Sequence, residues 1–510
     1  MSERHSQPIG HPRRSAVDVA AALNLVGALT KYLGAAALFP IPFALWYGET
    51  VVPFVAAGVV TTGLGLLLER ATNAPKARVG VREGFLVVAL TWLLAAVFAA
   101  LPYLFSGSEQ LGNPVNALFE GMSGITTTGA TVVTDYDELS RSLAMWRQFT
   151  QWIGGMGIIV LALAVLPRLR VGGRQLFDAE APGPEIGLSE RIRVTARRLW
   201  LLYVALTALE AFALSLLGWL GIDDAMTPYE AIAHALTTMP TGGFSTQARS
   251  IEAFSAAAQW IIALFIVVAG ANFALMYAAL VRRRPRVMAR DEEFRLYLIL
   301  IAIAAVALIT QIWVYGIAEG EEAVRMGVFQ VVTMITSTGY ASVDFGAWPG
   351  LLLLSLFGLM FVGGSAGSTS GGIKVVRHLL VGKVLRRELA HTVSPEVVIP
   401  IRLNGSPVDE RTLRALAAFI LLYVGLWAVG AAAIAVESAI GSVPVGTLDA
   451  LAISAASVGN VGPSFGITGP MGSYAPLGDV SKVTMVILMW VGRLEILPVV
   501  VLLTRHYWRL

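Results

Sequence analysis

The 510-residue chain has no cysteine, few charged residues and few histidines. Without cysteine there can be no disulfide bridge, thiolate nucleophile or cysteine-ligated metal. Charged residues make up 14% of the chain, whereas soluble domains carry roughly 25%. The six histidines are scattered and lack the spacing of metal ligands. These shortages argue against a site built on cysteine or histidine chemistry.

The chain is rich instead in apolar sequence. Apolar residues make up 56% of it, and the mean hydropathy is +0.70. Many windows reach the ~20 apolar residues that a helix needs to cross a bilayer core. Residues 1–16 are polar and basic and lead into a full-length apolar helix without a small-residue cleavage site, so we expect no removable signal peptide. The composition predicts an all-α polytopic membrane protein.

A short pattern, in which a hydroxyl-bearing or small residue leads into glycine, occurs four times. The copies are Thr127-Thr128-Gly129-Ala130, Thr241-Gly242-Gly243-Phe244, Ser337-Thr338-Gly339-Tyr340 and Ser457-Val458-Gly459-Asn460. The glycines at 129, 242, 339 and 459 are 113, 97 and 120 residues apart. Any single copy would be an ordinary glycine after a helix. Their recurrence with similar flanking segments predicts one structural unit repeated four times.

Each unit is predicted to contain a long helix, a short helix, the glycine turn and a second long helix. The predicted helices cover 83–105, 114–126 and 143–166; then 197–220, 228–238 and 256–280; then 294–315, 322–336 and an interrupted helix from 348; and finally 412–436, 446–456 and 480–504. The short helices have about 11 to 15 residues, or roughly 16–22 Å, which is too short to cross a membrane. We therefore expect them to be re-entrant.

The units define the expected domains. A two-helix pair, predicted at 20–46 and 51–68, occupies domain 1–80, and the pore repeats occupy 81–178, 179–290, 291–390 and 391–510. With re-entrant short helices, the basic clusters at 168–174, 191–198, 282–290, 377–387 and 402–414 all fall on one side. The positive-inside rule makes that side cytoplasmic, together with both termini.

Four non-helical turns at membrane depth must face protein or water, so we expect them to meet around one central pore. A ring of backbone carbonyls can replace the hydration shell of a cation, and glycine leaves the path open. Neutral oxygens without a carboxylate ring favour a large monovalent cation. The expected ion-binding residues are Thr127, Thr128, Gly129, Thr241, Gly242, Ser337, Thr338, Gly339, Val458, Gly459 and Asn460.

These motifs resemble the Trk/Ktr/HKT superfamily of potassium transporters, most closely its TrkH type. The resemblance runs from about residue 20 to the end and rests on the segments at 126–131, 237–245, 151–157, 363–374 and 492–495. It implies four pore-loop domains with one glycine per filter strand, binding K+ at Gly129, Gly242, Gly339 and Gly459. The fourth copy departs from the pattern, with Val458 where the others have Thr and Pro463-Ser464 where relatives are expected to have Pro-Gly.

The resemblance also implies partners and a location. We expect a homodimer in the lipid bilayer of the inner membrane, on a TrkA-like cytoplasmic nucleotide-binding regulatory subunit. No organic cofactor and no nucleic-acid partner are expected. The implied function is potassium uptake, with an H+- or Na+-coupled symporter or a less selective K+/Na+ conductor as alternatives.

A glycine-rich loop interrupts the second long helix of the third unit. Trp348–Val362 supplies about 15 residues, or roughly 22 Å of helix, before the loop begins. A phosphate-binding loop is excluded because Ile373 separates Gly372 from Lys374 and no Ser or Thr follows the lysine. A loop at this depth must line the water path, so we expect a gate. Its residues are Gly363, Gly364, Ser365, Ala366, Gly367, Ser368, Thr369, Ser370, Gly371, Gly372 and Lys374.

Arg493 completes the predicted gate. It lies about 13 residues, or roughly 20 Å, into the last helix, where an arginine faces protein or water. We expect it in the pore below the filter, and the resemblance implies that the arginine of this Gly-Arg-Leu-Glu motif helps to close the path. An ion pair with Glu210 remains an alternative.

Three other polar residues lie in or near the predicted membrane helices. We expect Glu120 and His234 to make structural hydrogen bonds, and Asn272 to line the cavity or bond a neighbour. A membrane-embedded enzyme using 363–374 as a substrate loop is the alternative class of function, but the sequence shows no convergent nucleophile or acid–base pair. We therefore expect no enzymatic activity. The asymmetry below the filter is expected to consist of one broken helix, in unit three, and one arginine, in unit four.

Overall fold

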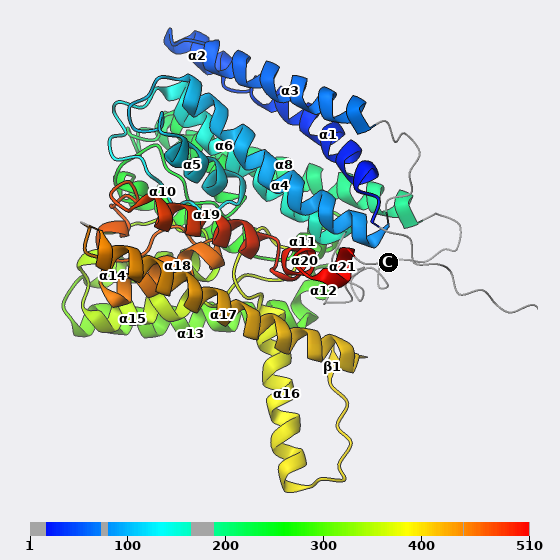
Figure 1. Cartoon of the computed structure of the whole chain (residues 1–510). Helices are drawn as coiled ribbons and strands as arrows, with labels where there is room; N and C mark the ends of the chain where they lie inside the picture. Colours follow the sequence, from blue (N-terminus) through cyan, green and yellow to red (C-terminus); the bar gives the residue numbers. More distant parts are fainter. Residues whose placement is uncertain (1–16, 73–79, 165–187, 442, 509–510) are drawn as a thin grey trace, which may run out of the picture.

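The computed structural model describes residues 17–72, 80–164, 188–441 and 443–508, and these are mainly helical (Figure 1). Six of the described helices are long and apolar enough to cross a membrane. A bent pair, α10 (Ala256–Ala269) and α11 (Phe273–Leu280), makes a seventh span if it counts as one. The predicted all-α membrane class is confirmed.

The N-terminal pair packs closely along one side of the molecule (Figure 1). It consists of α1 (Val19–Ala36), α2 (Ile41–Tyr47) and α3 (Val52–Thr72). The first predicted helix is interrupted before Ile41, where Pro40 removes a backbone donor. A Cβ on Gly65 would lie 2.5 Å from the backbone nitrogen of Lys31, so small residues let α1 and α3 approach closely.

Each of the four units opens with a long helix followed by a short one. The long helices are α4 (Val81–Phe105), α8 (Leu188–Trp219), α13 (Glu292–Val314) and α17 (Glu410–Ile440). The short helices are α5 (Pro114–Ile125), α9 (Pro228–Thr238), α14 (Gly320–Ile335) and α18 (Thr447–Gly459). Asn113 and Thr227 cap α5 and α9 with their side chains, and each is followed by proline at the first helical position. The prediction of four short helices is confirmed.

The second long helix differs from unit to unit. Unit one has α6 (Arg141–Ala164), unit two α10 and α11, unit three α15 (Gly350–Leu359) and α16 (Val375–Val393), and unit four α19 (Asp479–Arg493) and α20 (Leu497–Leu502). The continuous helices predicted for 256–280 and 480–504 are therefore wrong.

Local chemistry explains both unexpected breaks. The axes of α10 and α11 meet at 104° because Asn272 leaves the helix and accepts hydrogen bonds from the backbone N–H groups of Ala274 and Leu275. In unit four, Glu495 and Ile496 have φ values of 58° and 64°, which no α-helix contains. The prediction that only unit three has a broken helix is thus wrong.

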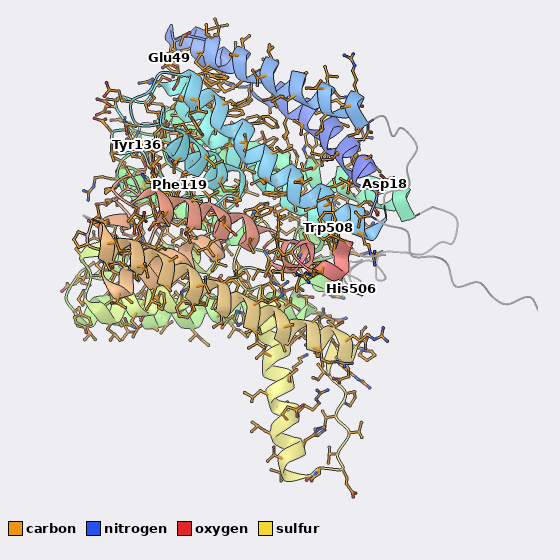
Figure 2. The ribbon with its side chains drawn as sticks, viewed as in Figure 1. Asp18, Glu49, Phe119, Tyr136, His506 and Trp508 are labelled. Carbon is orange, nitrogen blue, oxygen red and sulfur yellow. The ribbon has the colours of Figure 1, made fainter. Side chains whose placement is uncertain are left out.

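Short elements complete the described chain. They are α12 (Pro285–Arg290), α21 (Arg505–Trp508), three 3-10 turns at Ser250–Ala253, Phe345–Ala347 and Gly466–Thr468, and an antiparallel hairpin of β1 (Arg402–Leu403) and β2 (Ser406–Pro407). Helix α16 projects away from the bundle (Figure 1). Asp18, His506 and Trp508 lie at one end of the molecule and Glu49 at the other (Figure 2).

Two large apolar clusters hold the bundle together. One joins the N-terminal pair to units one and four, through residues such as Phe54, Phe119 and Met485. The other lies mainly in units two and three and includes Tyr203 and Leu352. The units therefore share cores with their neighbours, which fixes where the ends of the short helices meet.

Candidate ion pathway

The turns after the four short helices have the same backbone hydrogen bond. In each turn a backbone N–H donates to the carbonyl five residues earlier. The donor and acceptor pairs are Thr128 and Ser123 (2.9 Å), Gly242 and Thr237 (2.8 Å), Thr338 and Thr333 (2.8 Å), and Val461 and Ala456 (2.8 Å). The preceding residue is left-handed in each, with φ of 52° at Thr127, 54° at Thr241, 54° at Ser337 and 53° at Asn460. The hydrogen bonds thus align the four turns residue by residue.

A glycine with positive φ follows in every turn, and these glycines form a closed ring. They are Gly129 (φ 86°), Gly243 (79°), Gly339 (80°) and Gly462 (100°). A Cβ on each would overlap a carbonyl oxygen of the next turn, in the order Gly242, Thr338, Val461 and, back at the start, Thr128. Both the conformation and the space therefore require glycine. The four turns meet around one axis.

The ring corrects the predicted register in units two and four. The equivalent glycines are Gly129, Gly243, Gly339 and Gly462, whereas Gly242 precedes the ring glycine and Gly459 is the last residue of α18. Val458 also lies within α18. The fourth short helix ends with a left-handed Asn460, a residue type that tolerates this conformation, so its glycine comes three positions later than the Ser-Val-Gly pattern indicates.

The hydroxyls of the turns are buried, and those of the first and third turns include one pair each. The Thr126 and Thr128 hydroxyls lie 2.7 Å apart, as do those of Thr336 and Thr338. Asn460 donates from Nδ2 to the Thr128 hydroxyl at 3.0 Å, which ties the fourth turn to the first. These bonds fix the turns on which the ring carbonyls lie.

A buried ion pair supports the first two turns from behind. Glu120 and Arg147 are 2.7 Å apart and fully buried. Glu120 accepts a hydrogen bond from the Val132 backbone at 3.0 Å, and Arg147 donates to the Ser245 carbonyl at 3.3 Å. The structural role expected for Glu120 is confirmed. Arg147 was missed, although an arginine within a predicted membrane helix is itself a signal.

His234 has the structural role that the sequence predicts. Its Nδ1 lies 2.8 Å from the Glu230 carbonyl, and its Nε2 lies 2.9 Å from the Ser245 hydroxyl. The imidazole therefore joins its own short helix to Ser245, and the carbonyl of Ser245 in turn accepts from Arg147.

A cavity of about 330 Å³ opens on the side of the ring away from the short helices. Three ring glycines, Gly129, Gly243 and Gly339, form part of its lining, together with Tyr136 and Tyr474. Tyr474 also donates to the Gly462 carbonyl at 2.6 Å. The cavity is a vestibule that leads to the ring.

The glycine-rich loop 363–372 lies against the opposite side of the ring. The Gly371 N–H donates to the Ser337 hydroxyl at 2.5 Å, and a Cβ on Gly371 would overlap the Gly459 carbonyl. The Thr369 hydroxyl donates to the Met239 carbonyl at 3.0 Å. The loop therefore touches the ends of three short helices.

The broken helix of unit two provides a cradle for this loop. Asn272 donates to the Ala366 carbonyl at 2.5 Å, and the Phe273 N–H donates to the Gly367 carbonyl at 3.1 Å. On the other side, a Glu293 oxygen accepts from the Ala366 N–H at 2.6 Å. Of the two alternatives for Asn272, bonding a neighbour is therefore the one observed.

Arg493 contacts the loop directly. It is 2% exposed, and its Nη1 donates to the Thr369 carbonyl at 2.8 Å. Among the ion pairs of the described residues, Arg493 does not pair with Glu210, and Glu495 pairs with Arg377. The Lys374 ammonium donates to the Ser370 carbonyl. Arg377, whose guanidinium carbon also lies 3.8 Å from the centre of the Phe419 ring, was predicted only as part of the basic cluster 377–387.

Known proteins match almost the whole chain. A family model described as TrkH, cation transport protein, matches residues 52–508. The Trk system potassium uptake protein TrkH of Halomonas elongata is 35% identical over 96% of this chain and 98% of its own length. The protein of the same name from Escherichia coli is 36% identical over 95% and 98%. A crystal structure of the potassium transporter TrkH from Vibrio parahaemolyticus has a TM-score of 0.86 at 32% identity, covering 96% of this chain and 100% of that one.

Proposed function

The chain belongs to the TrkH cation transport family, and on that premise we propose that it takes up potassium across the inner membrane through the carbonyl ring. One observation carries the proposal. The four turns close on one another, so the carbonyls of Thr128, Gly242, Thr338 and Val461 surround a single axis. Such a ring supplies neutral oxygens, which suit a monovalent cation.

The surroundings of the ring favour a cation as well. The four short helices end at the turns, so their negative C-terminal ends are directed at the ring. The hydroxyls of Thr127, Thr241 and Ser337 lie one residue before the ring carbonyls and offer further oxygens. In our proposal K+ binds at this level, and Gly129, Gly243, Gly339 and Gly462 allow the strands to approach it.

We further assign gating to residues 363–372 with Lys374 and Arg493. The loop touches the ring from below, and Arg493 holds it at Thr369. The fixed charge of Arg493 there opposes the passage of a cation. To open the path, the loop must move away from Asn272 and Glu293, which breaks only a small set of hydrogen bonds.

The assembly proposal follows the same premise. The pair 1–80 and the repeats 81–178, 179–290, 291–390 and 391–510 form one subunit of a homodimer, with both termini cytoplasmic and a TrkA-like regulatory subunit below. Helix α16 favours contact with a second copy, because it projects from the bundle and carries exposed apolar side chains. These are Leu385 (58% exposed), Leu389 (61%) and Val393 (84%). Channel-like conduction is favoured over H+- or Na+-coupled symport because no carboxylate lies among the ring residues.

Cation flux in proteoliposomes tests the proposal. The purified protein should pass K+ and Rb+ in preference to Na+ under an imposed voltage without a pH gradient. Gly339→Ser should reduce this preference, because the new side chain overlaps the Val461 carbonyl. Selectivity unchanged in a well-folded Gly339→Ser protein would refute the filter, and flux that requires a proton gradient would favour the symporter.

A further inference from the structure

The second turn of the ring lacks a side chain that the other three possess. The residue whose carbonyl joins the ring is Thr128, Thr338 or Val461 in three turns and Gly242 in the second. The φ of Gly242 is not left-handed, so its backbone conformation does not require glycine. Another cause must explain the missing side chain.

The side chain of Gln151 occupies the place of the missing one. A Cβ on Gly242 would overlap the Gln151 amide, with the Cδ atom 2.5 Å and Nε2 3.0 Å away. Gln151 belongs to α6 of unit one and is fully buried. One repeat thus completes the turn of the next.

Two glycines on α6 make this approach possible. A Cβ on Gly155 would lie 2.5 Å from the Cβ of Pro240, just before the second turn. A Cβ on Gly154 would overlap the Ile125 carbonyl, at the start of the first turn. Helix α6 therefore lies directly against both turns, and Gln151 is one helical turn from its two glycines.

The Gln151 amide binds the second turn on both sides of its ring glycine. Nε2 donates to the Gly242 carbonyl at 2.7 Å, and Oε1 accepts from the Phe244 N–H at 3.1 Å. Only a side chain that is both donor and acceptor can satisfy the two groups at once. Gly243, between them, approaches the Thr338 carbonyl of the third turn.

We propose that Gln151 is a specificity-determining positioning residue, which holds the Gly242 carbonyl at its place in the ring and so sets the discrimination between K+ and Na+. The inference rests on the proposed filter function. A carbonyl has two lone pairs, so the Gly242 oxygen can accept from Gln151 and still face an ion. The other three turns carry a side chain of their own at this position, whereas the second depends on α6.

Gln151→Leu removes both hydrogen bonds at similar volume and gives the first test. Gln148→Leu is the matched control, because Gln148 is fully buried on the same helix and its amide has no hydrogen-bond partner among the described residues. We expect Gln151→Leu to lower the K+/Na+ flux ratio by roughly three- to tenfold, the range that corresponds to one net buried hydrogen bond. Gln148→Leu should keep the ratio of the unmodified protein.

A rescue separates positioning from simple packing. Gly242→Thr alone should disrupt the turn, because its Cβ overlaps Gln151. Combined with Gln151→Ala, it should recover most of the flux ratio, since the second turn then carries the threonine that the first and third turns carry. In this double variant the threonine fills the space left by Gln151. The double variant therefore tests the proposal even if Gln151→Leu does not fold.

Flux ratios decide among the outcomes. An unchanged ratio in folded Gln151→Leu, an equal loss in Gln148→Leu, or no recovery in the double variant overturns the role of Gln151. If Gly339→Ser lowers the ratio while Gln151→Leu does not, this inference fails and the filter stands. If neither variant changes the ratio, the filter proposal itself fails.

Discussion

The four turns of the ring share one backbone pattern, whereas the four helix ends below it differ in every unit. Each turn has the same backbone hydrogen bond, a left-handed residue at the same position and a ring glycine. Below, α6 is continuous over its described residues, α10 bends into α11 at 104°, α15 opens into the loop, and α19 ends at Arg493. A ring of oxygen ligands around an ion needs equivalent positions about one axis. A gate, in contrast, needs only one segment that can move out of the ion path.

The region of Arg493 also contains a strained backbone turn. Ile496 has φ 64° and ψ −59°, and the Leu497 N–H bonds the Glu495 carbonyl at 2.6 Å, which makes a tight three-residue turn. A β-branched residue in this conformation costs on the order of 1–3 kcal/mol. The ion pair between Glu495 and Arg377 links this turn to α16, directly after the loop.

The largest effect is expected from the buried pair behind the ring. Arg147→Ala leaves Glu120 as an unpaired buried carboxylate, which should cost about 3–5 kcal/mol of unfolding free energy. The loss of stability should appear as a lower melting temperature of the purified protein. Arg249→Ala is the control, because that arginine is 61% exposed and its pair with Glu252 should contribute less than about 1 kcal/mol. Equal losses in the two variants would contradict the assigned role of Arg147.

The second prediction tests the register of the ring. Gly462→Ala should lower K+/Na+ selectivity by about tenfold or more, because its φ is 100° and its Cβ would lie 2.6 Å from the Thr128 carbonyl. Gly459→Ala should lower it less, since its φ is not left-handed and its nearest neighbour, the Tyr423 hydroxyl at 3.2 Å, needs to shift by only a few tenths of an ångström. Selectivity in the flux assay decides, and a greater loss in Gly459→Ala would restore the register read from the sequence.

That register shows where sequence reasoning stops. The four short helices and the glycine-rich loop were predictable, because length, hydropathy and glycine density carry them. The ring glycine of unit four was not, because the left-handed conformation falls on Asn460 and the Ser-Val-Gly pattern lies within α18. In unit two the sequence prediction chose Gly242 rather than Gly243, and only the contact with Gln151 explains why the first of these two residues is glycine.

The breaks below the ring were less accessible still. Asn272 caps α11, three residues after α10 ends, and its side chain also bonds the loop of another unit. Glu495 and Ile496 are ordinary helix residues by composition, and their left-handed conformation depends on tertiary contacts such as that with Arg377. Interactions between distant segments, not local preference, decide these positions.

The third prediction tests the proposed gate. Arg493→Ala removes the hydrogen bond to Thr369 and the positive charge below the ring, so basal K+ flux should rise severalfold. The K+/Na+ ratio should stay within about twofold, because the ring is untouched. Thr369→Val is the companion variant, since it removes the bond to Met239 but keeps the carbonyl that Arg493 binds. Reduced flux in folded Arg493→Ala protein would favour a structural role instead.

The smallest effect is expected from Glu495→Gln, which keeps the shape of the side chain and neutralises its pair with Arg377. Flux should rise by about twofold, less than in Arg493→Ala, because a hydrogen bond can replace the ion pair and Arg493 still holds the loop. Glu292→Gln is the control, since Glu292 pairs with Lys383 further along α16. If both variants raise flux equally, any weakening of α16 opens the path. If only Glu495→Gln raises flux, the proposed gate depends on the turn at Ile496. The contact between that turn and α16 would then control the gate without involving the ring.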